Sequence, residues 1–369
     1  MIRMPWTNLT APNVMIEVVG FCNLDCRACY KKFSSHIKSM NEIKDDLESA
    51  MKIRKLHTVS LSGGEPTLHP DLCAVVEMIK REGLHVFLLT NGVLIDEDYL
   101  RRLKAAGLDF ILFHVDLGQK RPDFPEEPTF ADVQDRLDEL VGLADSFGLD
   151  VSISFTLYDE GDERKICPYF LKQPETSFLF LSSATDLKAF YGGLTSENKY
   201  DGHTRGDRVK KMERYFQERY HFEPFAYIPT KSGNSTVWIS YFIPIIYRKN
   251  KTRFYHYRST WMDVFLMKMV QFFTGRHIHK TTHNFFVTFL RVALNGISCL
   301  RIFPAAKFLI LALLPGSQLR HKMIVYDGGP FIIEGNKIEY CEYCPTAIVR
   351  NGELLSCCTA DYQLEASLK

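Results

Sequence analysis

Strand-like apolar runs alternate at short intervals with amphipathic stretches along the first half of the chain. Each apolar run reads as a buried strand, and each stretch after it has the apolar spacing of a helix. This alternation predicts β/α units that build a parallel sheet. The expected strands cover 14–20, 58–61, 85–90, 110–116, 151–157 and 177–181, and the expected helices cover 41–55, 71–81, 96–106 and 130–147. Units of this kind predict an open partial barrel with its chemistry on the loops that follow the strands.

The pattern changes in the second half of the chain. Beyond about residue 200 the alternation stops, and no fold is assigned up to about residue 335. We therefore expect an α/β protein: a partial (β/α)6 barrel with a C-terminal extension that carries a second cysteine-rich metal site. The expected regions are a barrel over 14–205, a basic and apolar-rich region over 206–335, and a cysteine-rich tail over 336–369.

Several protein classes are excluded by composition. With 46% hydrophobic and 24% charged residues among 369, the chain has an ordinary globular composition. The longest apolar run, 308–314, falls far short of the ~20 residues of a spanning helix, so we do not expect a transmembrane protein. Residues 1–10 show no secretory pattern, and a cytoplasmic location is expected.

The net charge of +1 conceals a strong asymmetry. Residues 248–325 contain thirteen Lys or Arg and one acid, Asp263, and bulky apolar residues lie between the cations. Such a mixture is typical of an interfacial surface that lies on a membrane, here the inner face of an anionic one. A solvated basic helix face or a lid over an apolar substrate tunnel would also fit. Nucleic acid is an unlikely partner, since no recognised binding module is present there.

Cysteine spacing carries the main chemical signal. Ten cysteines in a chain without a secretory pattern favour metal ligands, because the cytosol keeps thiols reduced. Cys22, Cys26 and Cys29 directly follow the first expected strand, so one loop can hold three corners of a cubane iron–sulfur cluster. Zinc, the alternative, would want a fourth ligand in a closed site. Three ligands leave one iron open for another group.

This loop resembles that of the radical S-adenosylmethionine (radical SAM) enzymes, whose signature is Cys-x-x-x-Cys-x-x-Cys after the first barrel strand. A second family element, a glycine-rich turn after the second strand, is matched by Gly63, Gly64, Glu65 and Pro66. The two motifs stand some forty residues apart, each at an expected strand end. The resemblance covers roughly residues 14–200.

The resemblance implies a 4Fe–4S cluster on the three cysteines, with S-adenosylmethionine chelating the open iron. It gives the glycine-rich turn the cofactor amine, and Gly63 and Gly64 are expected to let the backbone approach the methionine moiety. Reductive cleavage would yield a 5′-deoxyadenosyl radical that abstracts a hydrogen from the substrate. A reducing partner such as flavodoxin or ferredoxin is expected.

Other candidate cofactor-binding residues follow later strands. Thr90 and Asn91 resemble a family turn near the cofactor, although Asn-Gly is also simply a good turn dipeptide. His114 and Asp116 share one face of the fourth strand, where they can point at the cofactor or be core residues. Tyr30 follows Cys29, whereas many family members place an aromatic residue before the third cysteine. The adenine contact is therefore left open.

The tail contains a second group of cysteines. Cys341 and Cys344 precede two short apolar runs joined by Asn-Gly, a hairpin signal that returns Cys357 and Cys358 toward the first pair. A two-residue turn would bring Cys357 beside Cys344, whereas a three-residue loop would favour Cys358. The tail is similar to the auxiliary-cluster tails of radical SAM enzymes, including an abbreviated SPASM type, and Cys299 is one candidate for a fourth ligand. A zinc knuckle is the alternative.

The leading hypothesis is an oxygen-sensitive radical SAM enzyme acting on a small molecule, with a lipid or lipid-linked molecule favoured by the basic, apolar region. A second hypothesis is a SPASM-like maturase of a ribosomal peptide. The third, from a different class, is an iron–sulfur electron-transfer or scaffold protein. The intact turn at Gly63, Gly64 and Glu65 argues against a scaffold, because an electron carrier does not need to hold S-adenosylmethionine.

Overall fold

The computed structural model describes residues 1–184, 205–249, 251–278, 284–333, 337–350 and 352–361. Its centre is a run of six parallel strands, each hydrogen-bonded to the next. They are β2 (Asn13–Val19), β3 (Thr58–Gly63), β4 (His85–Thr90), β5 (Phe110–His114), β6 (Asp150–Leu157) and β7 (Thr176–Ser183). The six strands coincide with the six expected ones to within two residues at each end, which confirms the partial barrel.

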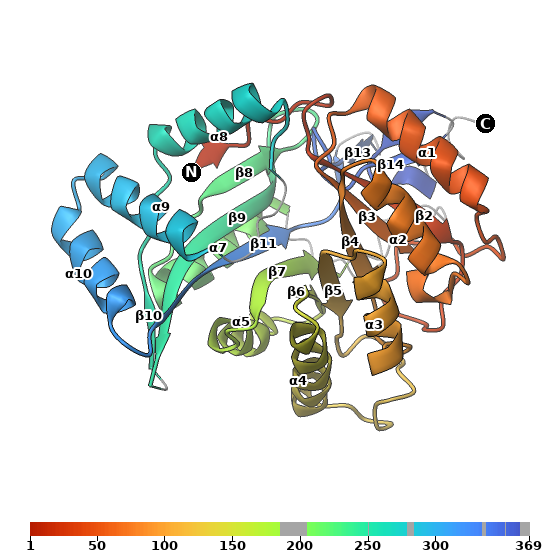
Figure 1. Cartoon of the computed structure of the whole chain (residues 1–369), viewed down its shortest axis with the longest axis horizontal. Helices are drawn as coiled ribbons and strands as arrows, with labels where there is room; N and C mark the ends of the chain where they lie inside the picture. The colour runs from red at the N-terminus through yellow and green to blue at the C-terminus, as the bar shows by residue number, and fades with distance from the viewer. Residues whose placement is uncertain (185–204, 250, 279–283, 334–336, 351, 362–369) are drawn as a thin grey trace.

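Helices cover the outer face of this barrel (Figure 1). They are α1 (Met40–Ile53), α2 (Leu72–Arg81), α3 (Glu97–Ala105), α4 (Phe130–Ser146) and α5 (Glu163–Lys172), with a short 3-10 turn η1 (Pro66–Leu68) after β3. In α1 the buried residues Ile43, Leu47 and Ala50 recur at helical spacing, and a capping box between Ser39 and Glu42 starts the helix. The sequence did not predict α5, which contains Pro168, a residue that disfavours helix interiors.

The second half of the chain extends the same sheet. Here lie α7 (Arg205–Tyr220), β8 (Ala226–Pro229), β9 (Thr236–Arg248), β10 (Lys251–Phe254) and β11 (Gln318–Asp327), and β1 (Ile2–Arg3) pairs with β8. Strand β11 runs parallel to β7 and antiparallel to β9. Within the described residues, thirteen strands join in one sheet. The boundary expected at 205/206 stays a prediction.

Strand β9 explains why no alternation is visible beyond residue 200. Ten consecutive residues of β9 are buried, because both faces of the strand are covered. Ile239 and Tyr241 pack in the main core with Phe216 of α7, whereas Trp238 and Phe242 lie in clusters on the other face. A strand buried on both sides reads as a continuous apolar run, which periodicity alone cannot assign.

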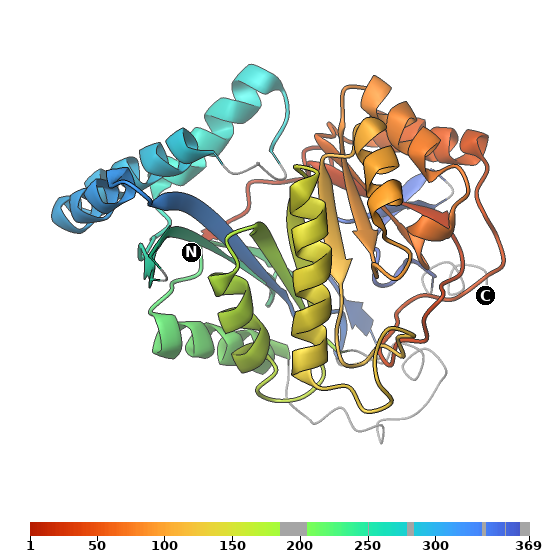
Figure 2. The ribbon, with the colours of Figure 1, turned by 60° about the horizontal axis from the view of Figure 1, so that its bottom comes forward.

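Three helices form a separate layer beside β8–β11: α8 (Trp261–Thr274), α9 (Phe285–Ser298) and α10 (Ile302–Leu313). Figure 2 shows this layer projecting at the end of the molecule away from α1 and α2. None of the helices in the described part of the chain has both the length and the apolar character to traverse a bilayer.

The tail returns to the first barrel strand. Its strands are β12 (Phe331–Ile333), β13 (Lys337–Glu339), β14 (Ile348–Arg350) and β15 (Glu353–Leu355). Strand β14 pairs in parallel with β2, with Ile348 opposite Met15, and so covers the edge that β2 would otherwise expose. The buried guanidinium of Arg54 donates to the carbonyls of Asn13, at 2.8 Å, and Cys344, at 3.0 Å. The tail is thus fixed to the barrel by backbone and side-chain contacts.

Candidate functional site

Three half-buried cysteines, Cys22, Cys26 and Cys29, lie in the loop that follows β2. The Leu24 N–H donates to Cys22 Sγ at 3.4 Å, and the Cys29 N–H donates to the Cys26 carbonyl at 3.3 Å. Among the described residues, no three His, Cys, Asp or Glu side chains converge as the ligands of a single metal ion would. Cysteines that hold an iron–sulfur cluster bind separate iron atoms and do not converge on one point.

The electrostatics of the loop suit a cationic cluster. Burial raises the pKa of Cys26 to about 12, with the charges of Asp116, Cys29 and Cys22 adding to the effect, and burial also raises the pKa of Cys22. Metal ligands must be thiolates, so two neighbouring thiols that resist ionisation, Cys22 and Cys26, need a positive partner to hold them deprotonated. The donor set therefore fits an iron–sulfur cluster on these three cysteines.

The glycine-rich turn packs directly against the cysteine loop. The Gly64 N–H donates to the Val19 carbonyl and the Glu65 N–H to the Phe21 carbonyl, each at 2.9 Å. A Cβ on Gly64 would stand 1.9 Å from the Phe21 carbonyl oxygen, and a Cβ on Gly63, where φ is +146°, would stand 2.3 Å from that of Val19. The glycines are thus required by contact between two segments of this chain, a role that differs from the expected clearance for the cofactor.

Glu65 connects this turn to the end of β4. Its Oε1 accepts from the Thr67 N–H at 3.0 Å, the Thr67 hydroxyl at 2.6 Å and the Thr90 hydroxyl at 2.7 Å, and its Oε2 accepts from the Asn91 N–H at 2.8 Å. Burial raises its pKa, and these hydrogen bonds oppose that rise. The carboxylate is therefore occupied by the chain itself. Pro66, beside it, begins η1.

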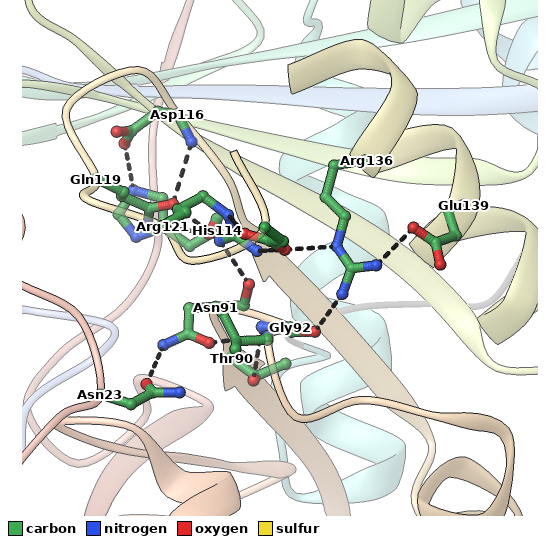
Figure 3. A network of polar contacts seen from close by, with 12 residues as sticks. Asn23, Thr90, Asn91, Gly92, His114, Asp116, Gln119, Arg121, Arg136 and Glu139 are labelled. Carbon is green, nitrogen blue, oxygen red and sulfur yellow. Dashed lines mark hydrogen bonds and ion pairs between the residues drawn. The ribbon is translucent and has the colours of Figure 1, made fainter. Parts of the chain in front are cut away.

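Asn91 carries the connection on to the cysteine loop (Figure 3). Its side-chain amide donates to Asn23 Oδ1 at 2.7 Å and reaches Cys22 Sγ at 3.8 Å. Its carbonyl accepts from Arg121, whose side chain is fully buried, at 2.8 Å. The structure thus places Asn91 against Cys22 and Asn23, and Thr90 against Glu65, while a cofactor contact of either residue stays a prediction.

His114 and Asp116 lie together at the end of β5, although Asp116 stands just beyond the strand. His114 Nε2 is 2.8 Å from Asp116 Oδ2 and 3.1 Å from the hydroxyl of Thr156 on β6. Asp116 is fully buried, whereas 37% of the His114 side chain is exposed. His114 is thus a polar group that stays accessible at the ends of the strands.

The loop after β5 also holds the cysteine loop. The Arg27 N–H donates to the Gly118 carbonyl at 2.8 Å, and Cys26 forms an antiparallel bridge with Gln119. The Tyr158 ring packs so closely that a Cβ on Gly118 would stand 1.9 Å from it. Gln119, Arg121 and Tyr158 were not predicted, because no local motif marks residues whose role is to contact a distant loop.

A cavity of about 820 Å³ lies beside Tyr158, between the ends of β6, β7 and β11 and helix α7. Ser183 and Tyr326, whose hydroxyl groups share a 2.7 Å hydrogen bond, are among its lining residues. Charges of both signs surround it, and they come from Asp159, Glu160, Glu163, Arg164, Arg208, Lys211, Arg214, Glu218 and Arg219. The cavity is large enough for a small-molecule substrate or a peptide side chain.

The hairpin β14–β15 settles the register of the tail cysteines. Arg350 pairs with Glu353 across a two-residue turn. Thr346 Oγ1 stands 3.2 Å from Cys357 Sγ and 3.6 Å from Cys344 Sγ, so Cys357 returns beside Cys344. Cys341, Cys344 and Cys357 share one hydrophobic cluster with Trp6 and Trp238. Cys358 follows, 3.4 Å from the Ser356 hydroxyl.

The thiols of the tail behave differently from those of the loop. A hydrogen bond with Cys357 lowers the pKa of Cys344 to about 6 despite its burial, while the same bond raises the pKa of Cys357. Cys299, considered as a fourth ligand, instead caps the C-terminus of α9. It lies near Tyr255, which belongs to a different hydrophobic cluster from the tail cysteines. Within the described residues it does not join the tail group.

Four charged residues, two buried and two partly buried, connect the two cysteine groups. Lys31, two residues after Cys29, forms ion pairs with Glu17 of β2 and, at 2.8 Å, with Asp361 of the tail. Arg350 of β14 pairs with Glu17 and, at 3.4 Å, with Asp361. Tyr30 lies in the same region, where burial and the charges of Cys357 and Glu17 raise its pKa. Tyr30 thus lies close to the tail cysteines as well as to the loop.

Comparison with known proteins identifies the barrel. Residues 16–164 match the Radical SAM superfamily. The 7,8-dihydro-6-hydroxymethylpterin dimethyltransferase of Methanocaldococcus jannaschii is 34% identical over 114 residues, which cover 29% of this chain and 22% of that protein. A probable GTP 3′,8-cyclase of Methanococcus maripaludis is 37% identical over 108 residues, 27% of this chain and 35% of that one. The chain thus matches only about a fifth to a third of the length of these relatives.

Among solved structures, SuiB of Streptococcus suis bound to its precursor peptide SuiA aligns with a TM-score of 0.43 and 16% identity, over 57% of this chain and 47% of that chain. The superfamily uses a 4Fe–4S cluster and S-adenosylmethionine, and the curated relatives that share it are named as enzymes. The cysteine loop, the glycine-rich turn and the sequence match agree: residues 16–164 of this chain are a radical SAM domain.

Proposed function

We propose that the whole chain is a radical SAM enzyme, in which Cys22, Cys26 and Cys29 hold a 4Fe–4S cluster that binds S-adenosylmethionine. The observation that carries this proposal is the way three other loops fix the cysteine loop: the Gly63–Gly64 turn, Asn91 and Gln119. When bound, the cluster and S-adenosylmethionine supply a 5′-deoxyadenosyl radical that takes a hydrogen atom from the substrate.

The chain's own residues position and shield this chemistry. Glu65 and Arg121 hold the Thr90–Asn91 turn against Cys22, so the loop keeps its shape without help from solvent. The domain leaves His114 partly exposed at the strand ends, where it can donate a hydrogen bond to cofactor or substrate. The cavity beside Tyr158 lies at the same edge of the sheet and would bind the substrate.

The proposed substrate is a lipid or a lipid-linked small molecule. The support is the unusual number of apolar side chains that α8–α10 expose, together with the positive charge of residues 248–325. A flavodoxin or ferredoxin would supply the electron. We accordingly place the enzyme in the cytoplasm, peripheral to the inner face of the membrane.

A peptide substrate is the second candidate, because the tail gathers cysteines as an auxiliary-cluster site would. Cys341, Cys344 and Cys357 share one cluster of buried residues, and Cys358 adjoins them. We propose that they hold a second iron–sulfur cluster. A zinc knuckle at this position would have no redox role.

The test is anaerobic reconstitution followed by reduction with dithionite and chromatography for 5′-deoxyadenosine, with iron and sulfide measured on the same sample. Deoxyadenosine formation with about eight irons per chain would support two 4Fe–4S clusters. Adding membrane lipid extract or peptide libraries in parallel reactions then separates the two substrate classes by which one stimulates turnover. If no S-adenosylmethionine binds to a fully assembled first cluster, the chain is instead an iron–sulfur scaffold.

A further inference from the structure

The three helices α8–α10, hereafter the helical arm, pack against the sheet through only part of their surface. Thr288 of α9 hydrogen-bonds to His321 of β11 at 2.9 Å, and Val292 is buried beside Phe242. Helix α10 turns Phe308 and Ala312 inward. Figures 1 and 2 show the arm on one flank of the molecule, with its other side facing away from the sheet.

The outer side of the arm is apolar. Of 21 large hydrophobic residues exposed among those the structure describes, 15 lie between Trp261 and Leu314. The most exposed of them are Phe272 at 80%, Phe273 at 74%, Phe286 at 79%, Leu300 at 88% and Phe303 at 88%. A surface helix of a globular protein normally presents charged residues on this side. So many exposed apolar residues in one region mark an interaction surface.

Helix α8 buries a carboxylate and exposes aromatic rings, and its Met267 is partly buried against the cluster that contains Phe242. Asp263 is its one buried residue in the described structure, and it accepts hydrogen bonds from the Tyr257 hydroxyl at 2.6 Å and the Thr260 N–H at 2.9 Å. Arg291 of α9 adds an ion pair at 3.4 Å. The aromatic residues of α8 therefore have no inward role in packing that would explain them. None of the described residues covers these rings.

The charges on the arm are positive. Lys268 and Lys307 are exposed, and neither forms an ion pair with any residue that the structure describes. The sole acid between residues 248 and 325, Asp263, is buried. The exposed surface of the arm thus combines cations and aromatic groups without a negative charge.

We propose that the helical arm docks on the surface of a bilayer that contains anionic phospholipids. Phe272, Phe273 and Phe303 enter the boundary between head groups and acyl chains, and Lys268 and Lys307 meet lipid phosphates. Helices of 14, 14 and 12 residues reach about 21 Å at most, against roughly 30 Å of hydrocarbon, so they lie in the interface. A second copy of the chain would instead bring like charges together.

This surface deepens the proposed function, since it rests on the membrane placement given there, but it does not depend on the radical chemistry, because the cysteine sites contribute no residue to the arm. The assay is flotation of the purified full-length protein with vesicles of phosphatidylcholine alone or mixed with phosphatidylglycerol. We expect binding to the mixed vesicles, weakening as salt is raised. The flotation assay needs neither cluster assembly nor turnover. A lack of vesicle binding would therefore contradict the docking proposal alone, and the deoxyadenosine assay would still test the proposed radical chemistry.

Two paired variants test the two components. Phe272→Ser with Phe273→Ser is expected to lower the partition coefficient at least about tenfold, because two exposed rings lose their burial in lipid. Lys268→Glu with Lys307→Glu is expected to lower it by about tenfold or more on mixed vesicles. Leu94→Ser and Lys172→Glu are matched controls, exposed residues outside the arm, and should bind as the wild type does.

Trp261 provides a direct reporter. It is 68% exposed on α8, whereas the other two tryptophans, Trp6 and Trp238, are buried at 7% and 8% exposure. Its emission should shift to shorter wavelength with mixed vesicles and be quenched by brominated lipid, and Trp261→Phe should remove the shift.

Equal binding to neutral vesicles at high salt, or binding unchanged in the double serine variant, would overturn the proposal. So would a dimer, seen by light scattering, that the double serine variant dissociates, because a second copy would then cover the arm.

Discussion

The two cysteine groups use the same side chain in opposite surroundings. Cys22, Cys26 and Cys29 lie half-buried in a loop at the ends of the strands, and burial raises the pKa of Cys26 to about 12. Cys344 is only 8% exposed, yet a hydrogen bond with Cys357 lowers its pKa to about 6. The hydrogen bonds around Cys344 thus change its pKa more than its burial does. The loop stays open for a cofactor, whereas the tail is closed, as a structural or electron-relay site would be.

The largest expected effect is at the open site. Replacing Cys22, Cys26 and Cys29 together by Ala should reduce deoxyadenosine to background, because no thiolate remains there to hold iron. Chromatography of anaerobic reactions measures it. Cys73→Ala, a half-buried cysteine of α2 outside both groups, is the control and should behave as wild type. Deoxyadenosine from the cluster-free triple variant would contradict the role given to the loop.

The next largest effect is expected at the tail cysteines, and it distinguishes their metal from that of the cysteine loop. Cys341→Ala with Cys344→Ala should remove about one cluster's worth of iron, about four atoms, while the first cluster remains. Iron and zinc analysis with electron paramagnetic resonance provides the measurement. Cys299→Ala serves as the matched control, since that residue lies at the end of α9. Unchanged iron with loss of zinc would make the tail a zinc knuckle.

The buried and partly buried charges that join the two cysteine groups give the third prediction. Arg350→Met leaves Glu17 and Asp361 with one cation fewer and should lower the free energy of unfolding by about 3 kcal/mol. Urea denaturation of the purified protein measures the change. Arg81→Met removes an exposed pair with Glu77 and should cost less than about 1 kcal/mol. Equal effects in the two variants would mean that the tail is not held through these charges.

The smallest effect is on thiol ionisation. In metal-free protein Cys344 should lose its proton as the pH rises through about 6, whereas burial should keep Cys26 protonated well above neutral pH. Thiolate ultraviolet absorbance, followed below the pH range in which tyrosines ionise, should show the first transition and none from Cys26. Cys344→Ala should remove the transition near neutrality and Cys26→Ala should leave it. If the Cys344→Ala variant still showed the thiolate transition near pH 6, another cysteine would be the thiol that ionises there.

Local patterns predicted the barrel well, because every strand from β2 to β7 has its own apolar run and most of the helices between them have their own caps and spacing. The cysteine loop and glycine-rich turn were found for the same reason: each is a short motif at a strand end.

Long-range contacts were out of reach of the sequence. Lys31 and Asp361 are 330 residues apart, and no pattern marks either as half of an ion pair. No motif marks Arg121 in the sequence, yet its side chain is fully buried and donates to the Asn91 carbonyl. The choice between Cys357 and Cys358 needed the hairpin turn, which the Arg350–Glu353 pairing fixes.

The sheet topology also sets an order for folding. Strand β7 needs β11, and β2 needs β14, but both partners stand far later in the chain, after residue 317. During synthesis the parallel core therefore waits with two unpaired edges while the ribosome completes the second half of the protein. Pairings across such sequence separations form slowly. Truncation before β11 should thus yield a chain that aggregates through its open edges.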